Sequence, residues 1–161
     1  CPSLPKEMCD SADAYKETAQ LFNEIGQECK DNGLQFGYHN HAFEFEKFDG
    51  QYGLDILLSN TDPQLVQMEL DTYWVEYAGL KSVDFMNKYS EHFKTLIHIK
   101  DMKSLEDKVN TEIGKGVIDF KEIVQVAKDL GIQWYIVEQE AFDIPQLDSI
   151  KESLEYLRGI L

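Results

Sequence analysis

The stretch TLIHIKD, residues 95–101, has the pattern of a strand with one apolar and one polar face. Its two isoleucines point to one side of an extended chain, and His98 and Lys100 point to the other, because side chains alternate along a strand. Its β-branched residues favour a strand over a helix. We therefore predict a strand whose apolar face packs on helices and whose polar face turns toward an interior.

The rest of the chain alternates between strand and helix patterns. Further strands are predicted at 34–41, 65–71 and 134–140, and helices at 11–31, 53–60, 82–93, 119–131 and 146–161. One helix followed by four strand–helix units is typical of a parallel sheet covered by helices. Because no linker rich in proline, glycine or serine interrupts the alternation, we predict a single α/β domain over residues 1–161.

Polar residues gather at the carboxyl ends of the predicted strands, where parallel α/β proteins bind their ligands. Strand alternation directs Asp71, His98 and Glu138 into one interior. Carboxylates and an imidazole that converge there would repel one another and be poorly solvated, so a divalent cation is predicted between them. Mostly oxygen ligands with one nitrogen suit Mn²⁺, Mg²⁺ or Co²⁺, with Zn²⁺ as an alternative.

Composition narrows the class of partner. A net charge of −15 argues against nucleic acid and against an anionic membrane surface, and no apolar run is long enough to span a bilayer. Cys1, Cys9 and Cys29 form no readable disulfide framework, which favours a reducing compartment such as the cytoplasm. The chain opens at Cys1-Pro2 without an initiator methionine, so a lost targeting signal and a periplasmic location stay open.

Five motifs occur in an order that resembles the sugar phosphate isomerase/epimerase family of xylose-isomerase-like TIM barrels. They are YHNHAFEF at 38–45, ELDTYW at 69–74 with AG at 78–79, HIKDM at 98–102, GKGVIDF at 114–120 and YIVEQE at 135–140. The resemblance implies a (β/α)8 barrel, of which this chain has the four units of the C-terminal half. A missing N-terminal half or a second identical copy would then complete the barrel, and the chain alone is expected to be inactive.

The resemblance also implies one divalent metal held by two glutamates, one aspartate and one histidine. When the motifs are matched to this sequence, the family's ligand positions fall on Glu44, Asp71, His98 and Glu138. Glu46 or a histidine stays open as the first ligand, because the first glutamate stands differently relative to the HxH in some relatives.

Each of these residues also has an ordinary structural interpretation. Asp71 is placed to cap a helix, and Glu138 to pair with Lys100. His98 has the alternative role of a hydrogen-bonded core residue, and Glu44 that of a solvated loop acid.

The predicted function is a metal-dependent sugar or polyol isomerase or epimerase that removes the proton beside a carbonyl. Glu138 or Glu44 would be the base, and Lys100 and His39 would stabilise the enediolate charge. The substrate would also contact His41 and Trp74, together with Lys100.

Three alternatives stay open at this point. Loss of a β-hydroxyl from a keto-sugar or inosose would make the protein a dehydratase or lyase with the same site. An endonuclease-IV-like nuclease is disfavoured by four histidines and the acidic charge. An inactive carbohydrate-binding fragment would bind no metal tightly.

Overall fold

The structure is a computed structural model that describes residues 1–161. Four parallel strands form its main sheet, in the spatial order β1 (Phe36–His39), β4 (Val66–Asp71), β5 (Leu96–Ile99) and β8 (Trp134–Val137). Helices connect successive strands of this sheet, which lets all four run in the same direction. The predicted α/β class with four βα units is confirmed.

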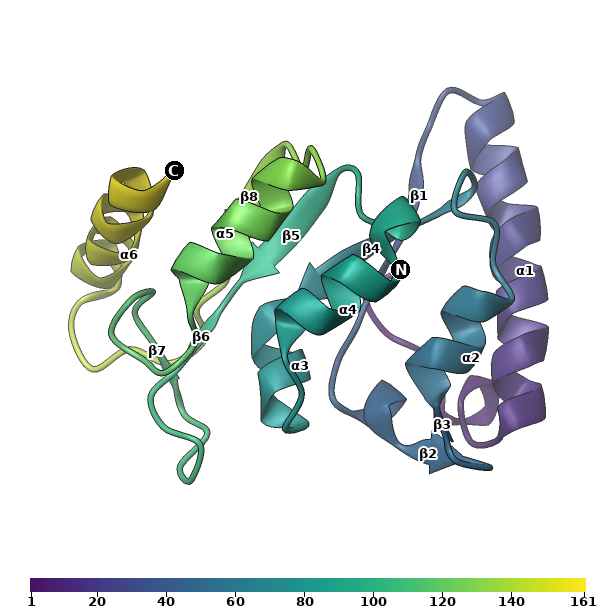
Figure 1. The fold of residues 1–161 in the computed structure, drawn as a ribbon, viewed down its shortest axis with the longest axis horizontal. Helices are drawn as coiled ribbons and strands as arrows, with labels where there is room; N and C mark the ends of the chain where they lie inside the picture. The colour runs from purple at the N-terminus through teal and green to yellow at the C-terminus, as the bar shows by residue number, and fades with distance from the viewer.

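Five helices lie close to their predicted positions: α1 (Ala12–Asp31), α2 (Gly53–Ser59), α4 (Ser82–Lys88), α5 (Phe120–Asp129) and α6 (Gln146–Ile160). Local chemistry sets several of their ends. The Ser11 hydroxyl accepts a hydrogen bond from the Ala14 amide at the start of α1, and the Asp119 carboxylate caps α5. Gly131, just after α5, has a φ of 77°, a conformation that favours glycine. In Figure 1 the helices follow one another across the sheet, from α6 near β8 to α1 near β1.

Several short elements were not expected from the sequence. The helix α3 (Thr72–Tyr77) starts directly at the end of β4, and the predicted helix 82–93 stops at Lys88, followed by a 3-10 turn, η3 (Ser90–His92). Two antiparallel pairs, β2 (Lys47–Phe48) with β3 (Gln51–Tyr52) and β6 (Asp101–Met102) with β7 (Asn110–Thr111), complete the strands. Two further 3-10 turns are η1 (Lys6–Met8) and η2 (Phe43–Phe45). Two-residue strands lack a periodic pattern, and their pairing is decided by tertiary structure.

The two faces of the main sheet have different surroundings. The outer face packs on the helices and buries Tyr38, Met68, Leu70, Ile97 and Ile99. The opposite, inner face carries His39, Glu69, Asp71 and His98, and the strand register sets His39 beside Glu69 and Asp71 beside His98. On the same inner face, Trp134 is 61% exposed and Ile136 is 41% exposed. The inner face is therefore the side where the chain's polar side chains gather and where apolar surface meets solvent.

None of the helices combines the length and the apolar character that crossing a membrane requires.

Candidate metal centre

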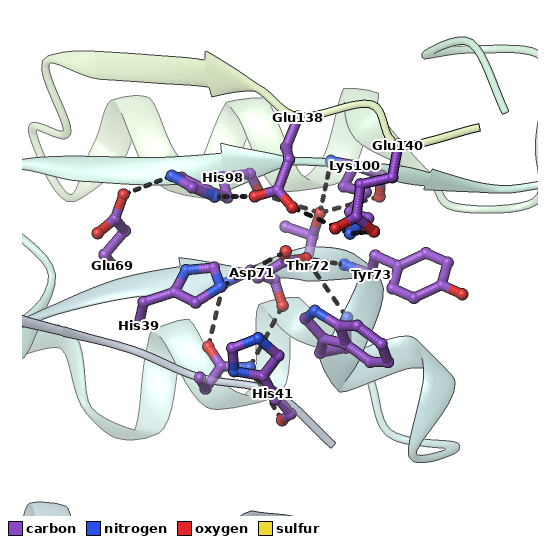
Figure 2. Close-up of polar contacts among 12 residues, drawn as sticks. His39, His41, Glu69, Asp71, Thr72, Tyr73, His98, Lys100, Glu138 and Glu140 are labelled. Carbon is purple, nitrogen blue, oxygen red and sulfur yellow. Dashed lines mark hydrogen bonds and ion pairs between the residues drawn. The ribbon is translucent and has the colours of Figure 1, made fainter. Parts of the chain in front are cut away.

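Four side chains converge at the carboxyl ends of the main strands. His39, Asp71, His98 and Glu138 each place one potential ligand atom within 4.8 Å of the others (Figure 2). They come from the ends of β1 and β4, from β5, and from the residue after β8. The structure thus brings together three of the four ligands expected from the sequence, and the fourth member of the cluster is His39.

Glu44 does not join this cluster. It lies in η2, beyond the end of β1, and its side chain is fully buried. Its Oε1 accepts a 2.5 Å hydrogen bond from the Tyr38 hydroxyl, and its Oε2 accepts a 2.9 Å bond from the His41 amide. Glu44 therefore anchors the loop after β1, and the interpretation as a solvated loop acid is wrong because the carboxylate is enclosed. Glu46 is exposed and is also outside the cluster.

Strand alternation explains why His39 takes this place. The inner face of β1 carries Gly37 and His39, and His39 lies in register with Glu69 of β4. The chain then turns into η2, so alternation along the strand no longer directs Glu44 inward. Applying to β1 the parity argument that selected Asp71 and His98 would have identified His39 from the sequence.

Asp71 has two roles, one for each carboxylate oxygen. Oδ1 accepts hydrogen bonds from the amides of Tyr73, at 2.8 Å, and Trp74, at 3.4 Å, and so caps α3. Oδ2 is buried without a hydrogen-bond partner and lies 4.0 Å from Nε2 of His39. Burial raises the pKa of Asp71 to about 7, with Lys100 opposing and Glu138 adding to the shift. The cap and the cluster are compatible because each uses a different oxygen.

His98 lies between two carboxylates. Its Nδ1 is 2.6 Å from Oε2 of Glu138, and its Nε2 contacts the carboxylate of Glu69. The other oxygen of Glu138, Oε1, accepts a 3.0 Å hydrogen bond from Nζ of Lys100. Burial by itself raises the pKa of Glu138, but hydrogen bonds and charge from Lys100 and His98 outweigh it and lower the pKa. The predicted ion pair between Glu138 and Lys100 is thus present beside the cluster.

The ammonium of Lys100 is buried, with a side chain only 1% exposed. Besides Glu138, it donates a 2.5 Å hydrogen bond to Glu140, and it lies 5.1 Å and 5.2 Å from the ring centres of Tyr73 and Trp74. Burial lowers the pKa of Lys100, but the hydrogen bonds to Glu140 and Glu138 outweigh it and the pKa is raised. A permanent positive charge therefore stands next to the cluster.

Aromatic rings form one wall of the site. The ring of His41 lies 5.0 Å from that of His39 and 5.5 Å from that of Trp74, centre to centre.

Burial, with the nearby charges of His98 and His41, lowers the pKa of His39 to about 4. His39 is therefore neutral at physiological pH, the form in which an imidazole binds a metal.

The donor set fits a divalent cation. Buried polar atoms normally have partners, yet Oδ2 of Asp71 and Nδ1 of His39 have none. Two imidazoles and two carboxylates are the ligand types that bind transition metals. Oδ2 of Asp71 lies 4.0 Å from Nε2 of His39, so a cation held by these two atoms would give the orphaned oxygen a partner.

Asp101 is a further buried carboxylate that the sequence did not single out. It accepts hydrogen bonds from the amides of Gly114, at 2.9 Å, and Gly116, at 3.0 Å, and from the amide of Ile118, at 3.3 Å. It thereby holds the GKGVIDF loop against the strand end that carries Lys100. Only the pairing of distant segments reveals this role, since the spacing of these residues follows no local pattern.

Metal-type donors at the carboxyl ends of consecutive parallel βα units are typical of TIM-barrel enzymes. The family model described as "Xylose isomerase-like TIM barrel" matches residues 1–160, and the chain belongs to this family. The four βα units form part of such a barrel, as the sequence predicted.

The relatives carry the names of enzymes that act on small carbohydrates or inososes. An inosose dehydratase from Clostridium beijerinckii is 28% identical over 143 residues, which are 78% of this chain and 47% of the relative. One from Clostridium botulinum is 29% identical over 155 residues, 86% of this chain and 49% of the relative. A crystal structure of a sugar phosphate isomerase/epimerase from Parabacteroides distasonis matches with a TM-score of 0.87 and 33% identity, over 98% of this chain and 56% of that one. The chain thus spans about half the length of the relatives it matches.

Proposed function

We propose that the protein is a divalent-metal-dependent enzyme that removes the proton beside a carbonyl of a sugar or cyclic polyol. The observation that carries the proposal is the convergence of His39, Asp71, His98 and Glu138 at the strand ends. The names of the relatives support a carbohydrate or inosose as the substrate class.

The metal would be held by the two imidazoles and two carboxylates of the cluster. When bound, a divalent cation polarises a carbonyl and makes the neighbouring C–H more acidic. Compared with the single nitrogen expected from the sequence, the second imidazole favours Mn²⁺, Co²⁺ or Zn²⁺ over Mg²⁺, which prefers oxygen ligands.

The other steps belong to the side chains. Glu138 is ionised at neutral pH, because its pKa is lowered, and it can accept the proton as general base. The buried ammonium of Lys100 is placed to donate a hydrogen bond to the oxyanion that develops on the substrate. His41 and Trp74 supply flat surfaces against which a sugar ring can pack.

The composition of the cluster favours elimination over epimerisation. Epimerisation needs a proton acceptor on one face of the substrate and a proton donor on the other. The ligand set expected from the sequence contained two glutamates, which could have filled these two roles. The cluster has one glutamate, Glu138, and His39 stands in place of the other. Glu138 alone can take the proton from the carbon and return it to the departing β-hydroxyl, which then leaves as water, so dehydration of a keto-sugar or inosose is the favoured reaction within this class.

We also propose that a second half-barrel covers the inner face. Trp134 and Ile136 are exposed there. At the opposite edge of the sheet, the Cys1 amine donates to the carbonyl of Gly37 at 2.8 Å, and the His39 amide donates to the carbonyl of Cys1 at 3.0 Å. These two bonds follow the pattern of parallel strand pairing, so the edge of β1 accepts a further parallel strand. Such a strand could come from another part of the same protein or from a second copy.

The test combines metal content with product analysis. The protein is expected to bind one Mn²⁺ or Co²⁺ per site and to dehydrate an inosose or keto-sugar. In D₂O the diketone formed from the unsaturated product should carry one solvent deuterium, at the carbon that lost the hydroxyl. Asp71→Asn should remove both metal and turnover, whereas Glu46→Gln, which removes one exposed charge outside the cluster, should change neither. Metal-independent turnover would overturn the metal proposal, and an epimer as the product would overturn dehydration.

A further inference from the structure

The carboxylate of Glu69 has no assigned role in the cluster, yet it touches one of its members. Glu69 lies on the inner face of β4, two residues before Asp71, and contacts Nε2 of His98 on the neighbouring strand β5. The structure shows no other hydrogen bond or ion pair to the side chain of Glu69. In Figure 2, Glu69 and Glu138 lie on opposite sides of the His98 ring, with Glu138 on the side of the cluster.

The two nitrogens of His98 therefore have different surroundings. Nδ1 is 2.6 Å from an oxygen of Glu138, which is itself a member of the cluster. A nitrogen and a carboxylate oxygen this close require a proton or a cation between them, because their lone pairs otherwise repel. Nε2 contacts Glu69, which is not a member of the cluster.

A neutral imidazole carries one proton, and only its other nitrogen can bind a metal. We infer that Glu69 is a positioning residue: it holds the proton of His98 on Nε2 and so presents Nδ1 as the metal-binding nitrogen. A carboxylate in this position also fixes the orientation of the ring and makes the imidazole a stronger donor. The inference rests on the proposed metal site, because it assigns the orientation of one of its ligands.

Two simpler roles for Glu69 lead to different expectations. If Glu69 only balanced the charge of the interior, a variant that keeps its shape but loses its charge would behave like one that loses both. If Glu69 itself bound the metal, glutamine and leucine would both weaken binding strongly, since neither supplies a carboxylate. A positioning role through a hydrogen bond predicts that glutamine retains most of the effect, because its amide oxygen still accepts from Nε2–H.

The experiment compares the protein with its Glu69→Gln and Glu69→Leu variants. Dissociation constants for Mn²⁺ and Zn²⁺ are measured by equilibrium dialysis, with Glu46→Gln as a control that removes one exposed acidic charge without touching His98. Glu69→Leu should raise the dissociation constant about 10- to 100-fold. Glu69→Gln should raise it much less, and the control should leave it unchanged. Equal losses in both Glu69 variants would overturn the inference, as would no loss in either.

Nitrogen NMR of ¹⁵N-histidine-labelled protein loaded with Zn²⁺ tests the inference on the unaltered protein, so its main result does not depend on the folding of a variant. His98 should show a protonated Nε2 and a metal-bound Nδ1, and Glu69→Leu should lose this single tautomer in the metal-free protein. Zinc bound through Nε2 in the unaltered protein would overturn the inference while leaving the proposed metal site in place. Absence of zinc binding in the unaltered protein would overturn the inference together with the proposed metal site.

Discussion

Oε1 of Glu44 accepts a 2.5 Å hydrogen bond from the hydroxyl of Tyr38 in the core beneath the loop after β1. The same carboxylate accepts from the amide of His41, so one buried group connects the end of the strand to the loop that follows it. Burial raises the pKa of Glu44, although these hydrogen bonds act in the opposite direction. A structural anchor and a metal ligand respond differently to substitution, so variants of Glu44 test whether this residue is a metal ligand.

Glu44→Ala is expected to destabilise the fold without removing the metal. The buried Tyr38 hydroxyl and the His41 amide would lose their acceptor, which costs about 1–3 kcal/mol for each unsatisfied group. Urea unfolding measures the loss, and equilibrium dialysis measures the metal. Glu44→Gln keeps an acceptor and should be milder. Complete loss of metal binding in a folded Glu44→Gln protein would show that Glu44 is a metal ligand.

His39→Glu is expected to keep metal binding and to change which metal is preferred. The substitution replaces a neutral imidazole with a carboxylate in a cluster that already contains Asp71 and Glu138. More oxygen and more negative charge favour Mn²⁺ and Mg²⁺ relative to Zn²⁺. Competition dialysis with pairs of metals checks the preference, and His39→Ala provides the variant that should bind weakly. Unchanged affinity in His39→Ala would show that His39 is no ligand.

Metal affinity is expected to fall as the pH falls below about 7. The Asp71 pKa of about 7 means that a proton must leave this carboxylate before it binds a cation. Each pH unit below that value should raise the apparent dissociation constant about tenfold. The His39 pKa of about 4 keeps that imidazole neutral through the same pH range, so His39 does not contribute to the pH dependence of metal affinity. Calorimetric titration with Mn²⁺ from pH 8 to about 5.5 measures the slope, and a flat profile would contradict the prediction.

Lys100→Met should abolish most turnover while leaving the metal in place. The substitution keeps a long apolar side chain beside the rings of Tyr73 and Trp74 but removes the charge next to Glu138. Loss of one group that stabilises an oxyanion costs about 10²- to 10³-fold in turnover. Lys103→Met is the matched control, since Lys103 is exposed and pairs at 3.5 Å only with the exposed Asp143. Normal turnover in Lys100→Met would remove Lys100 from the mechanism.

The purified 161-residue chain is expected to associate or to be unstable and inactive as a monomer. The inner face of β8 exposes Trp134 and Ile136, and the outer edge of β8 pairs with no other strand of the sheet. Light scattering measures the mass, and turnover is assayed on the same fraction. A stable monomer with full activity would contradict the proposal that a second half-barrel completes the site.

Local pattern in the sequence determined the alternating strands and helices, because the apolar faces of β4 and β5 and the caps of α1 and α5 depend on residues close in the chain. It also determined three members of the cluster, since side-chain alternation acts within a single strand. Strand parity also places His39 on the inner face of β1, but only the tertiary structure decided that the chain turns after this strand and takes Glu44 out of the cluster. The same holds for the contact between Glu69 and His98 and for the loop held by Asp101. Strand register and loop packing bring these residues together, and neither is encoded by spacing along the chain.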